Sequence, residues 1–147
     1  MTYTAFSTPD GVSKTPDFIS APSVDALPAF DDVLTLLQAA RAADDCLDGQ
    51  WFDLALSSYV DAADDAWTRA EHALHVFRAG HPDARDCVMA AGEMLLLMAD
   101  SGGDAARLRE RARKVRSAAL RGFYLFDAVR RDVARRLMQM ADVMDQM

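Results

Sequence analysis

Residues 59 to 77, YVDAADDAWTRAEHALHVF, hold the densest group of side chains in the chain that could carry chemistry. They include four carboxylates, one arginine and two histidines within nineteen positions. Carboxylates and imidazoles bind transition metals, and histidine transfers protons near neutral pH. Glu71 and His75 are one helical turn apart, as are His72 and His75, so either pair could share an ion. What this stretch can do therefore depends on the helix face that these side chains occupy.

An apolar stripe of alternating four- and three-residue spacing runs through the same stretch. It predicts a helix from about Gln50 to Ala79 whose stripe faces neighbouring helices. The stripe consists of Leu56, Val60, Ala63, Trp67, Ala70, Leu74 and Phe77. The opposite face carries Asp61, Asp65, Thr68, His72 and His75. We interpret most of the opening stretch as a water-facing surface, with an Asp65 to Arg69 helix pair, and predict no metal and no cofactor.

A second metal hypothesis concerns the corner where this helix meets the next one. Side chains that bind zinc or nickel gather there in the sequence. They are His72, His75, His81, Asp83, Asp86 and Cys87. Di-metal sites of helical bundles instead use inward ligands from several helices, with a glutamate three residues before a histidine, and this spacing does not occur here.

The stretch HVFRAG, residues 75 to 80, resembles the phosphorylated segment of histidine phosphotransfer domains, which are also helical bundles. The resemblance implies that His75 accepts a phosphoryl group and that Arg78 stabilises it. The small residues Ala79 and Gly80 would let a receiver domain approach. The family usually has lysine in the place of Arg78, and its helix continues where this chain has Gly80 and Pro82.

The stretch RAEHALH, residues 69 to 75, is similar to the arginine-to-histidine motif of helical ribonucleases of the higher-eukaryote-and-prokaryote nucleotide-binding class. That similarity implies that Arg69 binds phosphate and that His75 acts in acid–base chemistry on the ribose hydroxyl. The polar residue that usually follows the arginine is Ala70 here.

The chain as a whole predicts an all-α fold. It has 147 residues, is 51% apolar and is rich in alanine, leucine and methionine, which fits one helical domain. Residues 1–24 hold three of the five prolines, so we expect an extended or disordered N-terminal arm followed by a helical bundle domain over 25–147. A first helix should begin near Pro28 and end at Gly49. A third, over 83–100, is apolar on nearly every side, as a central helix of a four-helix up-down bundle would be.

The last predicted helix begins at Asp104, a plausible N-cap, and no proline follows it. Its apolar stripe slips by one residue to Leu137, Met140, Met144 and Met147. Either the helix breaks near Gly122, which gives a fifth helix, or its C-terminal half projects beyond the bundle. We favour the second alternative, which would expose Leu137, Met140 and Met144 to a partner, because methionine suits adaptable surfaces.

The charge is unevenly distributed along the chain. The net charge is −7, but residues 101–147 hold 11 bases and 6 acids. Arg109, Arg111 and Arg116 flank the apolar seam and should reach acids such as Asp44, Asp45 or Asp64. The bases Arg107, Arg113, Lys114 and Arg121 point outward, and we predict that they form a docking surface for an acidic protein. Nucleic acid is the open alternative, disfavoured by the overall negative charge and by the lack of interleaved aromatic residues.

Cys46 and Cys87 are expected to be unbridged, buried thiols, because about 40 Å of helix separates them. The longest apolar run, 13 residues over 87–99, is shorter than the roughly 20 that a bilayer requires. We therefore predict a cytoplasmic, non-enzymatic interaction or regulatory protein. It would bind a protein partner, including a second copy of itself, and no membrane.

Overall fold

The structure is a computed structural model that describes residues 22–23, 25–47, 56–100, 104–124 and 127–147. Within these ranges the chain forms five α-helices and no strand, so the all-α prediction is confirmed. The helices are α1 (Ala26–Leu47), α2 (Leu56–Gly80), α3 (Arg85–Ala99), α4 (Ala105–Phe123) and α5 (Ala128–Asp145). The predicted start of the second helix at Gln50 and the stop at Gly49 lie outside the described residues.

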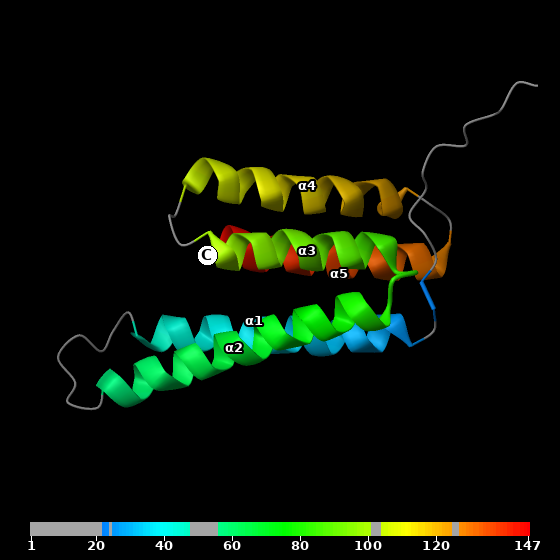
Figure 1. Ribbon diagram of the computed structural model, residues 1–147. Helices are drawn as coiled ribbons and strands as arrows, with labels where there is room; N and C mark the ends of the chain where they lie inside the picture. The colour runs from blue at the N-terminus through cyan, green and yellow to red at the C-terminus, as the bar shows by residue number, and fades with distance from the viewer. Residues whose placement is uncertain (1–21, 24, 48–55, 101–103, 125–126) are drawn as a thin grey trace, which may run out of the picture.

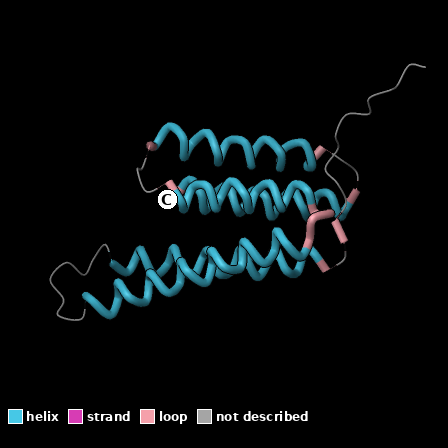
Figure 2. Tube along the Cα trace, in the orientation of Figure 1, coloured by secondary structure: helices cyan, strands magenta, loops and turns pink. Residues whose placement is uncertain are grey.

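The five helices lie lengthwise beside one another, and successive helices run in opposite directions (Figure 1). The closest partners are α1 with α2 and α4 with α5, while α3 packs against α2, α4 and α5. The α1–α2 pair and α4 lie on opposite sides of α3 and α5, as the trace in Figure 2 also shows. The third helix therefore lies between the α1–α2 pair and α4 (Figure 1), as its apolar composition favours, although not every side of it is covered.

The core combines apolar side chains of α1 with most of the apolar stripe that the sequence predicted for α2. Phe30 of α1 and Phe77 of α2 are buried, and their ring centroids are 5.0 Å apart. Leu74 of α2 is fully buried, but Val60, the second residue of the predicted stripe, is 39% exposed. The stripe of α2 is therefore a core face only from its second turn onward.

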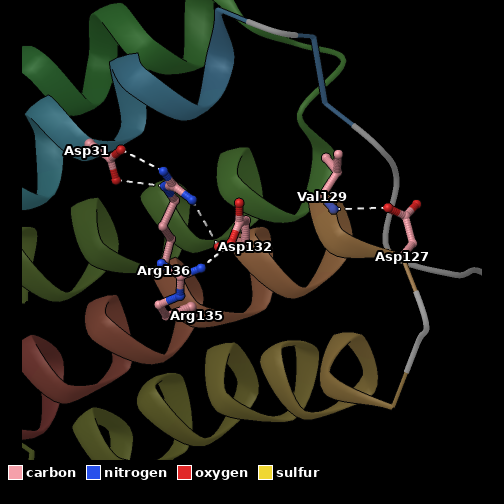
Figure 3. Close-up of polar contacts among 6 residues, drawn as sticks. All are labelled: Asp31, Asp127, Val129, Asp132, Arg135 and Arg136. Atoms are coloured by element: carbon pink, nitrogen blue, oxygen red, sulfur yellow. Dashed lines mark hydrogen bonds and ion pairs between the residues drawn. The ribbon is translucent and has the colours of Figure 1, made fainter.

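The last helix breaks, and our preferred prediction of one continuous helix that projects from the bundle is wrong. The helix α4 ends at Phe123, and α5 begins after Asp127. Asp104 caps α4 as predicted, and the Asp127 side chain accepts a hydrogen bond of 2.9 Å from the backbone N–H of Val129 (Figure 3). The alternative of a break near Gly122 is correct, because α5 folds back along α4 and buries the apolar stripe that would otherwise face water.

The methionine stripe is consequently part of the core. Leu137, Met140 and Met144 are fully buried within this single chain. The expectation that they form an exposed partner-binding surface is wrong for this reason. Met147, at the end of the stripe, is 40% exposed.

Polar contacts also join α1 to α5 and to α2. Arg136 of α5 donates two hydrogen bonds of 2.7 Å to the carboxylate of Asp31 on α1 (Figure 3). These bonds raise the pKa of Arg136 above its usual value. The indole N–H of Trp67 on α2 donates to Asp44 on α1 at 2.8 Å. The bidentate pair ties the last helix to the first, and the indole bond ties α2 to α1.

The predicted N-terminal arm is described only at Pro22 and Ser23, and the rest of residues 1–24 lies outside the described residues. The backbone N–H of Ser23 donates a hydrogen bond of 2.9 Å to the carboxylate of Asp83, in the turn between α2 and α3. This bond lowers the pKa of Asp83. None of the described helices is both long enough and apolar enough to cross a membrane.

Candidate functional site

One face of α3 is not covered by any other described helix. The neighbours α2, α4 and α5 cover the remaining faces. Along the uncovered face Val88, Met89 and Gly92 are half-buried, and Leu96 is 52% exposed. We call these four residues the outer stripe of α3. The outer stripe exists because this helix is apolar on nearly every side, whereas its close neighbours α2, α4 and α5 leave one side uncovered.

Two adjoining hollows follow the outer stripe and form one groove. The first, of about 470 Å³, is lined by Arg78, Pro82, Arg85, Val88, Met89, Gly92, Glu93 and Leu96. The second, of about 390 Å³, is lined by Glu93, Leu96, Arg107, Glu110, Arg111 and Lys114. Because the hollows share Glu93 and Leu96, we treat them as a single feature and name it the α3 groove. Its floor is α3, one wall is the end of α2 with the following turn, and the other wall is α4.

The α2 wall presents two arginines to the groove. The guanidinium of Arg78 lies over Gly92, and a Cβ atom at Gly92 would be 3.6 Å from the guanidinium carbon. Arg85 lines the same hollow and is exposed. Among the described residues, no ion pair joins either arginine to a carboxylate. Their charges are therefore available to a binding partner.

The α4 wall is fixed by a buried carboxylate. Glu93 of α3 accepts a hydrogen bond of 2.9 Å from Arg111 and another from Lys114. Burial alone would raise the pKa of Glu93, but the two hydrogen bonds outweigh it and the pKa is lowered. The Lys114 side chain is still 60% exposed, so this charge reaches both Glu93 and the solvent. Glu93 thus holds α4 against α3 in its ionised form.

The α3 groove is positively charged on a negatively charged protein. Five basic and two acidic side chains line it, whereas the whole chain has a net charge of −7. Charged edges beside an apolar floor are typical of surfaces that bind an amphipathic segment. The groove therefore combines the two physical requirements of a selective docking site.

Of the four outward bases that the sequence predicted, two line the α3 groove and two do not. Arg107 and Lys114 line the α3 groove, and Arg107 also lies 3.5 Å from the carboxylate of Asp100. Arg113 and Arg121 are exposed on α4 but outside the groove lining. The structure thus brings together two of the four predicted residues and adds Arg78, which the phosphotransfer resemblance had assigned to another role.

The predicted partners of the seam-flanking arginines are wrong. Arg111 pairs with Glu93, and Arg116 pairs with Asp142 at 2.9 Å and with Asp145 at 2.6 Å. The hydrogen bonds to Asp145 and Asp142 raise the pKa of Arg116. The predicted acids Asp44, Asp45 and Asp64 belong to α1 and α2, which lie on the opposite side of the molecule from α4 (Figure 1). Arg109 donates to the carbonyl oxygen of Ala105 in its own helix.

The histidines of α2 are exposed, which confirms the water-facing interpretation of the opening stretch. His72 and His75 are both at the surface, and Nε2 of His75 lies 3.9 Å from a carboxylate oxygen of Glu71. The predicted Asp65–Arg69 pair takes another form, because Arg69 donates to the carbonyl oxygen of Asp65 at 3.2 Å. The hypotheses that assign phosphotransfer or ribonuclease chemistry to His75 stay predictions.

The corner between α2 and α3 does not gather the predicted metal ligands. The ring of His81 packs 5.3 Å from that of Phe77, and Asp83 accepts the Ser23 amide. Burial raises the pKa of the Cys87 thiol to about 12. Within the described ranges, no three histidine, cysteine or acidic side chains are placed to hold one metal ion.

The two cysteines are free, as predicted, but only one is buried. Cys87 lies in the core, whereas Cys46 is exposed on α1. The expectation of two buried thiols is therefore wrong for Cys46. This position lies near the end of α1, beyond the last fully buried residue of that helix, Ala40.

Sequence reasoning missed the α3 groove itself. The one available signal was Glu93, a single acid within the apolar run of residues 87–99. Such a residue requires partners when it is buried. Its partners, and the uncovered face beside it, follow only from the packing of α4.

No protein-family model, curated protein or solved structure matches this chain.

Proposed function

We propose that this chain is a non-catalytic protein-binding module that docks a segment of a partner protein in the α3 groove. The observation that supports this proposal is the exposure of Leu96 at the centre of the groove, between two basic edges. Burying a leucine side chain contributes about 1.5–3 kcal/mol. A partner that covers the outer stripe would therefore gain binding free energy that the free chain does not use.

The side chains of the groove suit binding better than catalysis. Its lining, as far as the chain is described, contains no histidine, cysteine, serine or threonine. Its buried carboxylate, Glu93, is held ionised by two cations. A carboxylate in this state positions α4 and is poorly suited to accept a proton at neutral pH.

The proposal is tested by comparing the proteins that co-purify with three versions of the full chain. Leu96→Asp places a charge on the groove floor, and Leu120→Asp is the matched control at a leucine of α4 that is 45% exposed. We expect a partner that the wild type and Leu120→Asp recover and that Leu96→Asp loses, with unchanged helical circular dichroism in all three. A partner recovered equally by all three chains, or lost only by Leu120→Asp, would contradict the proposal.

A second candidate is self-association, and the separation of charge between helices favours it. The helix α4 carries seven basic side chains and one acidic side chain. The helices α1 and α2 together carry eight acidic and three basic side chains on the opposite side of the molecule (Figure 1). Two copies can therefore attract each other through unlike faces. Analytical ultracentrifugation should then give a mass greater than that of one chain at 50 mM salt and a smaller mass at 500 mM salt. The mass of a single chain at both salt concentrations would exclude self-association.

A further inference from the structure

We infer that the segment that fills the α3 groove is an amphipathic α-helix whose apolar stripe is bordered by carboxylates. This inference rests on the proposed function, because it names the chemistry of the partner that the groove would bind. Three observations support it: the shape of the groove floor, the positive charge of its two edges, and a described lining without aromatic side chains on which nucleic-acid bases could stack.

The floor of the groove has the repeat of a helix surface. The outer stripe runs from Val88 to Leu96, and the eight helical steps between these residues span about 12 Å, or roughly two turns. Apolar residues on such a face recur at spacings of three and four. A second helix packs on a ridge of this kind by fitting its own side chains between those of the first. Two turns of a partner helix therefore match the apolar length of the floor.

The edges of the groove require negative charge. Arg78 and Arg85 line one edge and have no carboxylate partner among the described residues. Lys114 lines the other edge, and its ammonium group has three donors, so it can serve both Glu93 and a ligand. An apolar or basic segment would bury these cations without supplying negative charge to neutralise them. A segment with carboxylates beside its apolar stripe compensates them on both edges.

The same features favour a protein segment over a nucleic acid. The outer stripe offers apolar contacts, which a phosphate backbone does not use. Among its described residues the groove lining has no aromatic side chain on which bases could stack. We therefore expect the negative charges that meet the groove edges to be carboxylates of a protein helix and not phosphates of a polynucleotide.

The test measures fluorescence anisotropy of labelled probes with the full chain. Three synthetic helical peptides share one leucine stripe and differ only in its borders, which are glutamate, glutamine or lysine. A labelled single-stranded RNA of 20 nucleotides is the fourth probe. The variants are Leu96→Asp on the floor, Arg78→Glu on one edge and Arg121→Glu as a matched control outside the groove.

We expect the glutamate peptide to bind about fivefold or more tightly than the glutamine peptide at 50 mM salt, and the difference to shrink at 500 mM. Arg78→Glu should remove this preference, Leu96→Asp should weaken both peptides, and Arg121→Glu should change neither. This pattern supports the inference.

The remaining outcomes overturn it in distinguishable ways. Equal binding of the three peptides that Leu96→Asp abolishes would refute the acidic helix but leave the α3 groove as the docking site. Tight RNA binding that is indifferent to Leu96→Asp would indicate a binder of polyanions. Binding that only Arg121→Glu abolishes would move the site to α4 and refute the proposed function as well. Absence of peptide binding would also overturn the inference. So would a wild-type chain with the mass of a dimer and a Leu96→Asp variant with the mass of a monomer, because the groove would then bind a second copy of the chain.

Discussion

At the scale of single residues, Glu93 shows how one acid in an apolar helix determines the packing of its neighbour. The sequence marks Glu93 as unusual because apolar residues surround it in the chain. Its partners Arg111 and Lys114 are 18 and 21 residues away. They were not predictable, because they depend on the rotation of α4 about its axis. The prediction that the arginines of α4 reach Asp44 or Asp64 was wrong for the same reason, because the rotation of α4 about its axis decides which acids its arginines meet.

Glu93→Gln should destabilise the fold by about 1–3 kcal/mol at pH 7, because Arg111 and Lys114 lose their charged acceptor. The pKa of Glu93 is lowered in the folded chain, so its contribution is present above the unfolded pKa of about 4.3 and is lost as the pH falls through the folded value. The variant should therefore lose less stability between pH 7 and pH 3. Urea unfolding at several pH values measures this. Glu110→Gln, at an exposed acid of α4, is the control, and equal effects of the two changes would contradict the account.

The two cysteines should differ sharply in reactivity. Cys46 is exposed, whereas Cys87 is buried with its pKa raised to about 12, so its thiol stays protonated at pH 8. An aromatic disulfide reagent should modify one thiol per chain rapidly and the second only on unfolding. Cys46→Ser should remove the rapid phase. Two rapid phases in the wild type would show that Cys87 is accessible.

At the scale of helices, apolar spacing predicted α1, most of α2 and α3, but not the end of α4. In α2 the spacing is unbroken, and burial follows it from Ala63 to Phe77 but not at Val60. Between α4 and α5 the signals were Gly122 and the one-residue slip of the stripe before Leu137. Local helix propensity does not distinguish a slip within a helix from a turn between two helices. Burial of Met140 and Met144 decides in favour of the turn.

Asp127 should be an energetically important residue of this turn. It accepts a hydrogen bond from Val129 at the start of α5, so Asp127→Ala should lower the free energy of unfolding by about 1 kcal/mol. Asp127→Asn keeps a capping oxygen and should restore most of the loss. Thermal and urea unfolding measure both variants. Equal destabilisation by alanine and asparagine would show that the cap is not the cause.

At the scale of the whole molecule, the sequence predicted the central place of α3 but not its uncovered face. That face depends on how many helices surround α3 and on the gap left between α2 and α4. The uneven charge along the chain was visible in the sequence. Its separation onto opposite sides of the molecule required the order of the helices (Figure 1).

The ion pair between Arg136 and Asp31 should stabilise the whole arrangement, because it joins the last helix to the first. Arg136 is mostly buried and binds Asp31 through two hydrogen bonds, so Arg136→Ala should cost about 1.5–3 kcal/mol. Arg135→Ala is the matched control, since Arg135 is exposed and pairs with Asp132 of its own helix. The control should cost less than about 0.5 kcal/mol. Similar losses in both variants would contradict the role of the pair.

The most direct measurement is site-specific photo-crosslinking from the floor of the α3 groove. A benzophenone amino acid replaces Leu96 in one chain and Leu120 of α4 in another, and each is irradiated in an extract of the native source. We expect a discrete crosslinked partner from position 96, with the crosslinked peptide in an acidic amphipathic helix, and none from position 120. Crosslinks from position 120 alone, or the same background from both positions, would contradict it.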